Sequence, residues 1–256
     1  RTNDLLLIPE VSFITGNTAP GSGAPFVNAG DVNNSGMEFQ IGYKKKVSDN
    51  FSFNVNYNLT TLDNEVLRVD NSLGYTSSGG FGIGQADVAR MEVGMPIGYF
   101  HGFKTDGIFQ NQAEVDAHPS QLELGAIAKP GDLRFVDINN DGIINESDKT
   151  YIGSPIPDVT MGLNISMDYK NFDFQMYLFS SIGNEIVRNY ERNLPLTNRT
   201  SYFLERWTGE GICTTFTSPS FYFLERWTGE GSTNSHPRVT TGATSNALFS
   251  DYYVED

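Results

Sequence analysis

Hydrophobic and polar residues alternate strictly over two long stretches of the chain. In FSFNVNYNLT, residues 51–60, the apolar positions are Phe51, Phe53, Val55, Tyr57 and Leu59, and a polar residue follows each of them. VTMGLNISMDY, residues 159–169, repeats this design with Val, Met, Leu, Ile, Met and Tyr at every second position. Because successive side chains of a β-strand point to opposite faces, each stretch predicts a strand with one apolar face and one polar face.

Each predicted strand has a partner across a short turn. Residues 37–46 (MEFQIGYKKK) alternate in the same way before the first strand, and Val47–Asn50 is the expected turn. Residues 172–182 (FDFQMYLFSSI) follow the second strand after the turn Lys170–Asn171. The chain therefore predicts two antiparallel hairpins. Little helix is expected, apart from one short helix over Gln110–His118.

Two folds accommodate these hairpins. In a soluble β-sandwich the apolar faces pack on a second sheet, whereas in an outer-membrane barrel they meet lipid and the polar faces line the lumen. Loop length favours the barrel, because the hairpin turns are short while long segments follow Thr60 and Ile182. Bacterial barrels have short periplasmic turns and long extracellular loops. We therefore expect residues 51–60 to run outward and residues 159–169 inward. Residues 61–158 and 183–250 would then be long extracellular regions.

Composition limits the classes of partner. The chain has 31 acidic and 17 basic residues and a net charge of -14, which argues against nucleic-acid binding. Its one basic run, Lys44–Lys46, is expected to be a solvated strand end. A single cysteine, Cys213, excludes an internal disulfide and a thiolate zinc cluster. No apolar run is long enough for a transmembrane helix. Since the first residue is Arg1, we expect the chain to begin inside a longer protein or after processing.

The stretch DINNDGIINESD, residues 137–148, matches the calcium-loop pattern of alternating oxygen ligands around a glycine, here Gly142. Ile144 would be its apolar anchor. Aspartate at the twelfth position, where the standard loop has glutamate, predicts a weaker, structural calcium site that stiffens the loop. The alternative is an Asn/Asp-rich turn satisfied by its own hydrogen bonds. The predicted metal ligands are Asp137, Asn139, Asp141, the carbonyl of Ile143, Asn145 and Asp148.

No catalytic signature is present, so an enzyme is not expected. The sequence contains neither G-x-S-x-G nor H-E-x-x-H, and its three histidines share no metal spacing. GGFGIG, residues 79–84, is expected to be a flexible loop. The aromatic residues of the long loops could stack on sugars or pack the loops, and packing is favoured. These residues are Tyr75, Phe81, Tyr99 and Phe100.

The decapeptide YFLERWTGEG occurs twice without change, at residues 202–211 and 222–231. A genuine repeat array needs more units and shows drift. The double copy is therefore interpreted as a recent duplication or a sequence-assignment error, the error being favoured. No function is assigned to the residues between the copies.

Three long segments of the chain are distinctive: the first is VGMPIGYFHGFKTDGIFQNQAEVDAH, the second runs from KPGDLRFVDINNDG to FDFQMYLF, and the third is ERWTGEGSTNSHPR. They closely resemble SusC/RagA-type TonB-dependent transporters of Bacteroidetes. Flanking stretches match the same family one strand earlier and at the start of the next inward strand. The matching residues are 93–118, 129–179 and 225–238, with flanks at 1–17, 27–46 and 250–256.

The resemblance implies an all-β fold, a partial antiparallel transmembrane β-barrel. Residues 1–256 would be an incomplete C-terminal part of a barrel of about 22 strands with long extracellular loops. The plug, the TonB box and the final strands would lie outside these residues. The family location is the bacterial outer membrane, in contact with lipid. Its function is TonB-dependent import of oligosaccharides or peptides with a SusD-like surface lipoprotein. The alternative is a secreted calcium-binding β-sandwich for adhesion or glycan binding.

Overall fold

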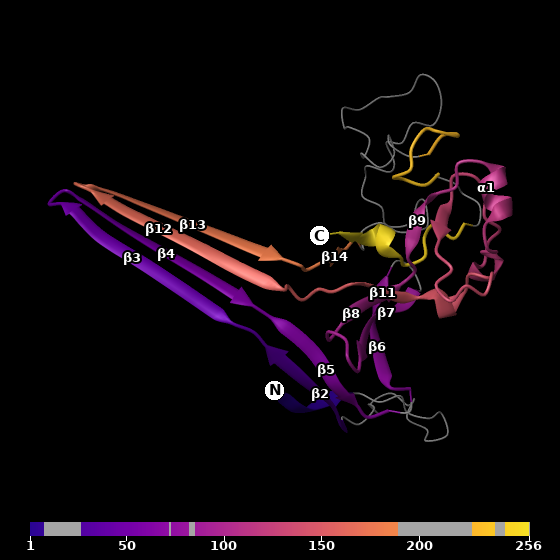
Figure 1. The fold of residues 1–256 in the computed structure, drawn as a ribbon, viewed down its shortest axis with the longest axis horizontal. Helices are drawn as coiled ribbons and strands as arrows, with labels where there is room; N and C mark the ends of the chain where they lie inside the picture. The colour runs from indigo at the N-terminus through magenta and orange to yellow at the C-terminus, as the bar shows by residue number, and fades with distance from the viewer. Residues whose placement is uncertain (8–26, 72, 82–84, 189–226, 239–243, 256) are drawn as a thin grey trace, which may run out of the picture.

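The computed structural model describes the chain except for residues 8–26, 72, 82–84, 189–226, 239–243 and 256. Figure 1 shows two parts, a long sheet that extends away from the rest and a head in which the other elements gather. The long sheet has the strand order β13-β12-β4-β3. Its strands are β3 (Glu38–Ser48), β4 (Phe51–Thr61), β12 (Val159–Tyr169) and β13 (Phe172–Ile182).

The long sheet confirms the two predicted hairpins. The bounds of β12 and β13 are those read from the alternation, and all four strands have 11 residues. The turn between β3 and β4 is shorter than Val47–Asn50, however, because β3 continues to Ser48. The pairing of β3 with β4 shifts register between Lys46 and Ser48, which accommodates Val47 as an extra residue. The turn itself is therefore Asp49–Asn50.

The two hairpins join through β4 and β12, which pair antiparallel along their whole length. This pairing agrees with the opposite strand directions expected from the sequence. Both short turns lie at the same end of the long sheet, and the head lies at the other (Figure 1). The backbone N–H of Lys170 donates to the carbonyl of Asn50 at 2.8 Å, so the two turns also contact each other.

The register places most apolar residues of the four strands on one face, whereas Tyr177 and Phe179 of β13 lie on the other. Val55 lies opposite Ile165 and Tyr43, and Met176 lies opposite Ile165 on the other side. These side chains are not covered by another sheet in the described part of the chain. Phe39, Phe174 and Leu178 keep 51–55% of their surface exposed. The opposite face is mainly polar and uncharged on the two central strands.

Two glycines of the long sheet make room for asparagines on that polar face. A Cβ added to Gly42 would lie 2.6 Å from the Oδ1 of Asn56, and one added to Gly162 would lie 2.5 Å from the Oδ1 of Asn58. The amides of Asn56 and Asn58 therefore lie across the neighbouring strands. This arrangement requires that the facing residue has no side chain.

The head contains short strands in four small sheets. The strands β2 and β5 continue the line of β3 and β4 into the head, where β2 also pairs with β1. A second sheet has the order β11-β8-β7-β6, and two strand pairs, β9 with β10 and β14 with β15, complete the set. The strands are β1 (Thr2–Leu7), β2 (Val27–Ser35), β5 (Asp63–Val69), β6 (Tyr75–Phe81), β7 (Gln85–Glu92), β8 (Tyr99–Gly102), β9 (Thr105–Ile108), β10 (Leu133–Phe135), β11 (Thr150–Gly153), β14 (Ile186–Val187) and β15 (Val254–Glu255).

One α-helix, α1 (Gln112–Ala117), lies within the predicted helix 110–118. The side chain of Asn111 caps it by accepting from the N–H of Glu114, as preferred N-cap residues do. In the described residues, three short 3-10 turns occur at Leu122–Leu124, Glu146–Asp148 and Asp251–Tyr253. None of the helices in the described ranges is long and apolar enough to cross a membrane.

The segment expected as a flexible glycine loop is in part a strand. Gly79 and Gly80 belong to β6, and Phe81, the last residue of β6, keeps only 2% of its surface exposed. Phe81 packs on Phe249 and Tyr253 at ring distances of 5.1 and 4.8 Å. The prediction was wrong because these contacts come from residues far along the chain. Residues 82–84 lie outside the described ranges.

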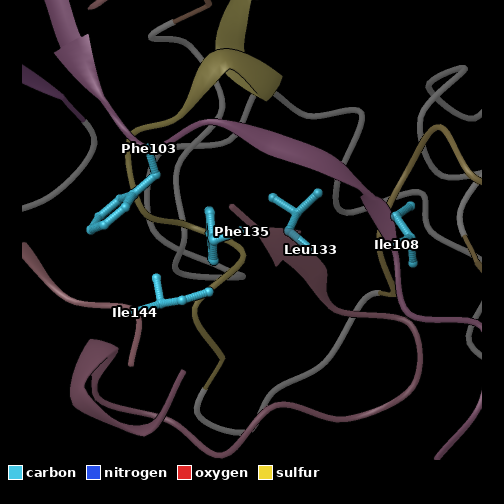
Figure 2. Packing of buried hydrophobic residues seen from close by; sticks show 5 residues of the cluster. All are labelled: Phe103, Ile108, Leu133, Phe135 and Ile144. Carbon is cyan, nitrogen blue, oxygen red and sulfur yellow. The ribbon is translucent and has the colours of Figure 1, made fainter. Parts of the chain in front are cut away.

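The largest buried cluster of the head lies against the predicted calcium loop and includes one of its residues. Figure 2 shows its five residues, which come from β9, from the connection between β8 and β9, from β10 and from the loop 137–148. Ile144 is among them and is fully buried, so its predicted role as the apolar anchor of the loop is confirmed. The loop is therefore attached to a hydrophobic core at one point. The cluster consists of Phe103, Ile108, Leu133, Phe135 and Ile144.

Candidate calcium loop and adjacent pocket

The first half of the loop 137–148 is curled by its own side chains. The carboxylate of Asp137 accepts from the N–H of Gly142 at 2.9 Å and of Asp141 at 3.3 Å. The Oδ1 of Asn139 accepts from the N–H of Asp141, and the Oδ1 of Asp141 accepts from the N–H of Ile143. Gly142 has φ +86°, a backbone conformation that glycine adopts without strain. The sharp turn predicted at this position is thus present.

Asp148 closes the second half of the loop onto the first. Its carboxylate is fully buried and accepts from the N–H of Ile138 at 3.0 Å and of Asn145 at 2.9 Å. The side chain of Asn145 in turn accepts from the N–H of Ser147, which forms a reciprocal capping box with Asp148. The loop therefore has a defined conformation held by hydrogen bonds between its ends.

The six predicted ligands belong to one closed loop, but their carboxylates are not gathered at a point. Among the described residues, no group of three His, Cys, Asp or Glu side chains is arranged to hold a metal ion. The hydrogen bonds of the loop are those expected of a self-satisfied Asn/Asp-rich turn. The donor set still consists of the hard oxygens that calcium prefers, and each carboxylate oxygen can accept more than one contact. Calcium binding remains a prediction.

The loop is also attached to the chain before it. The N–H of Ile144 donates to the carbonyl of Ser120 at 2.8 Å, and the N–H of Ser120 donates to the carbonyl of Gly142 at 3.3 Å. Both contacts lie beside the buried side chain of Ile144. Ordering the loop would consequently order residues near Ser120, which follow α1.

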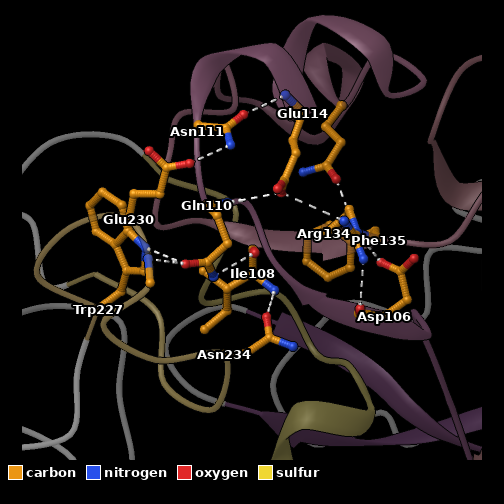
Figure 3. A network of polar contacts seen from close by, with 12 residues as sticks. Asp106, Ile108, Gln110, Asn111, Glu114, Arg134, Phe135, Trp227, Glu230 and Asn234 are labelled. Atoms are coloured by element: carbon orange, nitrogen blue, oxygen red, sulfur yellow. Dashed lines mark hydrogen bonds and ion pairs between the residues drawn. The ribbon is translucent and has the colours of Figure 1, made fainter.

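A pocket of about 390 Å³ lies between α1 and residues 231–234, a site that the sequence analysis did not predict. Figure 3 shows the polar network around it. Ile108 and Gln110 contribute from β9 and its end, Glu114 from α1, Arg134 from β10, and Thr233 and Asn234 from the opposite wall. No local motif could have revealed it, since its walls come from two distant parts of the chain, residues 108–134 and residues 231–234.

The charged residues of the pocket form a short chain. The Nε of Arg134 donates to Asp106 Oδ1 at 2.5 Å, and its Nη2 donates to the Asp106 carbonyl at 3.0 Å. The Nη1 of Arg134 lies 3.7 Å from Glu114 Oε2. Asp106 and Glu114 therefore hold the guanidinium between β9 and α1.

Gln110 attaches the opposite wall. Its Oε1 accepts from the N–H of Gly231 at 3.0 Å and from the indole of Trp227 at 3.3 Å, and its Nε2 donates to the carbonyl of Thr233. Every polar atom of this amide is used, as is usual for partly buried amides. Gln110 is thus a positioning residue for the 227–234 segment.

The buried carboxylate of Asp132 holds Arg238, which follows the 227–234 segment. Asp132 keeps 2% of its surface exposed and accepts two hydrogen bonds from Arg238, at 2.7 and 3.0 Å. Thr244 and Asn246 also donate to it. Asp132 thereby joins Arg238, Thr244 and Asn246 to the residues before the calcium loop.

The three histidines lie apart, in agreement with their lack of a metal spacing. His118 contacts the carbonyl of Pro119, and His236 contacts the hydroxyl of Tyr252. His101 lies on β8, and its Nδ1 is buried without a hydrogen-bond partner in the described residues. Burial, followed by the nearby cations Arg90 and Lys149, lowers the pKa of His101 to about 4.

The aromatic residues of the head mainly pack, as favoured from the sequence. Phe81 and Tyr99 are buried, and the ring of Tyr99 stacks on Tyr151 at 5.6 Å. Tyr99 donates to Glu92, and burial together with this carboxylate raises the pKa of the Tyr99 hydroxyl. Tyr75 lies under the guanidinium of Arg90 at 4.1 Å. The first copy of the duplicated decapeptide and Cys213 lie outside the described residues.

Comparison with known proteins gives a consistent set of relatives. The chain is 30% identical over 224 residues to the TonB-dependent receptor P26 of Formosa agariphila, a match that covers 82% of this chain and 21% of that protein. It is 30% identical over 169 residues to the TonB-dependent receptor SusC of Bacteroides thetaiotaomicron, covering 65% of this chain and 15% of SusC. The chain thus spans about a fifth of the length of these relatives. No family model matches it.

Solved structures show the same relationship at the level of the fold. The RagAB peptide transporter aligns with a TM-score of 0.57 at 16% identity, over 96% of this chain and 24% of that chain. The RagAB peptide importer in its open-open state aligns with a TM-score of 0.53 at the same identity, over 81% of this chain and 21% of that chain. The antiparallel all-β fold predicted from the sequence is confirmed.

Proposed function

The chain is a segment homologous to SusC/RagA-type TonB-dependent receptors, and we propose that the whole protein imports nutrients through a barrel that this segment helps to build. These receptors are outer-membrane β-barrel proteins and not enzymes. Within the proposal, the four strands of the long sheet are neighbouring strands of the barrel wall. The head is the extracellular part above them.

The exposed apolar face of the long sheet is the observation that carries this proposal. Strands of about 9–11 residues cross an outer membrane when tilted, and β3, β4, β12 and β13 have 11 residues each. Phe39, Ile41 and Tyr43 keep 55–56% of their surface exposed on this face. A sandwich would bury such side chains against a second sheet. Lipid is the environment that matches them.

The proposal includes partners and cargo. Energy would come from TonB, through parts of the protein outside this segment, and a SusD-like lipoprotein would cover the extracellular side. The cargo would be an oligosaccharide or a peptide. The name of the SusC relative and the peptide-transporter structures of RagAB support this combination. No observation in the described residues favours the secreted β-sandwich.

A structural calcium ion belongs to the same proposal. It would bind in the loop 137–148 and stiffen the head between Thr105 and Ile152. Asp137, Asn139, Asp141, Asn145 and Asp148 would hold it through side-chain oxygens, and Ile143 through its carbonyl. The ion would not take part in transport chemistry. The closed conformation of the loop and its anchor at Ile144 support this role.

The location and size of the native protein test the proposal first. An antibody against this segment should detect a heat-modifiable outer-membrane band several times larger than 28.3 kDa. Deletion of the encoding gene should abolish growth on, or uptake of, one oligosaccharide or peptide, and deletion of TonB should have the same effect. A soluble band near 28.3 kDa would overturn the barrel and support the secreted module.

A further inference from the structure

We propose that the pocket between α1 and residues 231–234 is a binding subsite for a neutral saccharide. This inference rests on the proposed import function and specifies its cargo. The pocket volume of about 390 Å³ falls within the range of roughly 300–1,000 Å³ that is usual for small-molecule sites. It is open to solvent.

Three side chains of the pocket each bind another part of the protein through some of their polar atoms and leave one polar atom without a hydrogen bond. Glu114 Oε2 accepts from the N–H of Gln110 at 2.9 Å, and its Oε1 makes no hydrogen bond to another described residue. Asn234 Oδ1 accepts from the N–H of Ile108 at 2.8 Å, and its Nδ2 likewise has no partner in the described part of the chain. The Nη1 of Arg134, at 3.7 Å from Glu114, is beyond hydrogen-bond distance.

These free atoms match the chemistry of sugar hydroxyls. Glu114 offers an acceptor, while Arg134 and Asn234 offer donors, and a hydroxyl group can both donate and accept. The positions of the three groups are fixed by their internal hydrogen bonds, so little ordering is needed when a ligand binds.

The charge of the pocket excludes polyanionic sugars from the proposal. Glu114 lines the pocket, and Asp106 pairs with Arg134 next to it, so two carboxylates lie near the single guanidinium of Arg134. Glu230 lies beside the pocket, held by Asn111 at 2.8 Å. A sulfate or uronate would be repelled by this excess of negative charge. A neutral saccharide meets no such penalty.

Two substitutions change the free atoms and keep the internal hydrogen bonds to Gln110 and Ile108. Glu114→Gln keeps an acceptor for the N–H of Gln110 but replaces the other oxygen with a donor. Asn234→Asp keeps the acceptor for Ile108 but replaces the donor with a carboxylate oxygen. Glu123→Gln and Asn184→Asp make the same chemical changes outside the pocket and serve as matched controls. Retained heat-modifiability of each variant reports that the barrel has formed.

The experiment measures binding of defined probes to the full-length receptor purified from the outer membrane. The probes are neutral hexasaccharides (an α-1,4-glucan, a β-1,3-glucan and a β-1,4-mannan), a sulfated oligosaccharide and a neutral hexapeptide. We expect at least one neutral hexasaccharide to bind, and each pocket variant to bind it about tenfold more weakly, which is the effect of one lost hydrogen bond. The controls should bind like the unmodified receptor.

Several results would overturn the inference. These are binding of no neutral hexasaccharide, equal binding by pocket variants and controls, or pocket-dependent binding of the peptide or the sulfated oligosaccharide. Failure of the import proposal is distinguishable, because it would appear as loss of outer-membrane location or of TonB-dependent uptake. If the receptor imports its cargo equally well with and without the pocket substitutions, the import proposal stands and the saccharide subsite is disproved.

Discussion

At the scale of single residues, Asp132 is a buried contact that joins distant parts of the head. Its carboxylate is buried and faces Arg238, whose side chain is 18% exposed. Neither partner could be paired from the sequence, because they are 106 residues apart and neither belongs to a motif. Long-range ion pairs of this kind are visible only once the fold has brought the segments together.

Substitution of Asp132 by Asn should loosen the 227–238 segment. The charge of Arg238 would lose its partner in a largely buried position, at a cost of about 2–3 kcal/mol in the free energy of local opening. Hydrogen exchange of residues 227–238 in the full-length receptor measures this. Asp106→Asn is the control, since Asp106 is 51% exposed and pairs near the surface. A smaller effect for Asp132 than for Asp106 would contradict the prediction.

His101 should make β8 sensitive to acid. Its pKa in the folded state is about 4, below the ordinary value of 6.5, so the unfolded state binds its proton first as the pH falls. The contribution of the neutral ring is therefore complete above pH 6.5 and decreases as the pH falls toward 4. Arg90 and Lys149 add to the effect, whereas Glu92 and Glu146 oppose it.

The measurement is the opening free energy of β8 by hydrogen exchange between pH 7 and pH 4.5, corrected for intrinsic exchange rates. His101→Gln cannot titrate and should flatten the dependence. An opening free energy of the unmodified receptor that stays constant over this range would disprove the assignment.

At the scale of elements, regular alternation was sufficient where strands were long. The bounds of β12 followed from its period of two, and those of β13 from the short turn that joins it to β12. Short head strands such as β10 and β11 lack this signal. They have three or four residues, and their partners are not adjacent in sequence. The region 61–158, expected as one long loop, therefore hides most of the strands of the head.

The loop 137–148 shows a different limit. Its pattern predicted a sharp turn at Gly142 and a buried anchor at Ile144, and both are present. The pattern also predicted a calcium ion. The same carboxylates can instead accept hydrogen bonds from the backbone of the loop, so the pattern alone does not decide whether an ion binds. Sequence therefore predicts the shape of such a loop better than its occupancy.

Removal of calcium should loosen Thr105–Ile152 without unfolding the long sheet. The ion would offset the charge of Asp137, Asp141 and Asp148, and without it these carboxylates repel one another. Limited proteolysis of the full-length receptor, with and without chelator, measures the effect. We expect faster cleavage in this region under chelator and unchanged heat-modifiability of the barrel.

Two variants sharpen this measurement. Asp141→Asn should show fast cleavage even with calcium present, whereas Glu146→Gln, at a position not predicted to bind the ion, should behave like the unmodified receptor. Identical cleavage with and without chelator would leave the loop as a self-satisfied turn.

At the scale of the whole molecule, the two faces of the long sheet should respond differently to charge. Leu163 and Asn164 are neighbours in the middle of β12 and belong to opposite faces. On the lipid side, Leu163→Arg should cost about 2–4 kcal/mol of folding free energy. On the polar side, Asn164→Arg should cost much less. The fraction of heat-modifiable, outer-membrane receptor measures both, and equal losses would refute the assignment of the faces.

The register of β4 and β12 has a consequence for how such a protein can change over evolutionary time. Thr61 and Val159 are paired residues, so the chain leaves the long sheet and returns to it at adjacent points. The hydrogen bonds between β4 and β12 form whatever the length of the segment that joins the two strands. Lengthening such a segment adds little entropic cost. An exchange of residues 62–158 between related proteins would therefore keep the strand order of the wall, provided that the new residues also pair with β2 as β5 does.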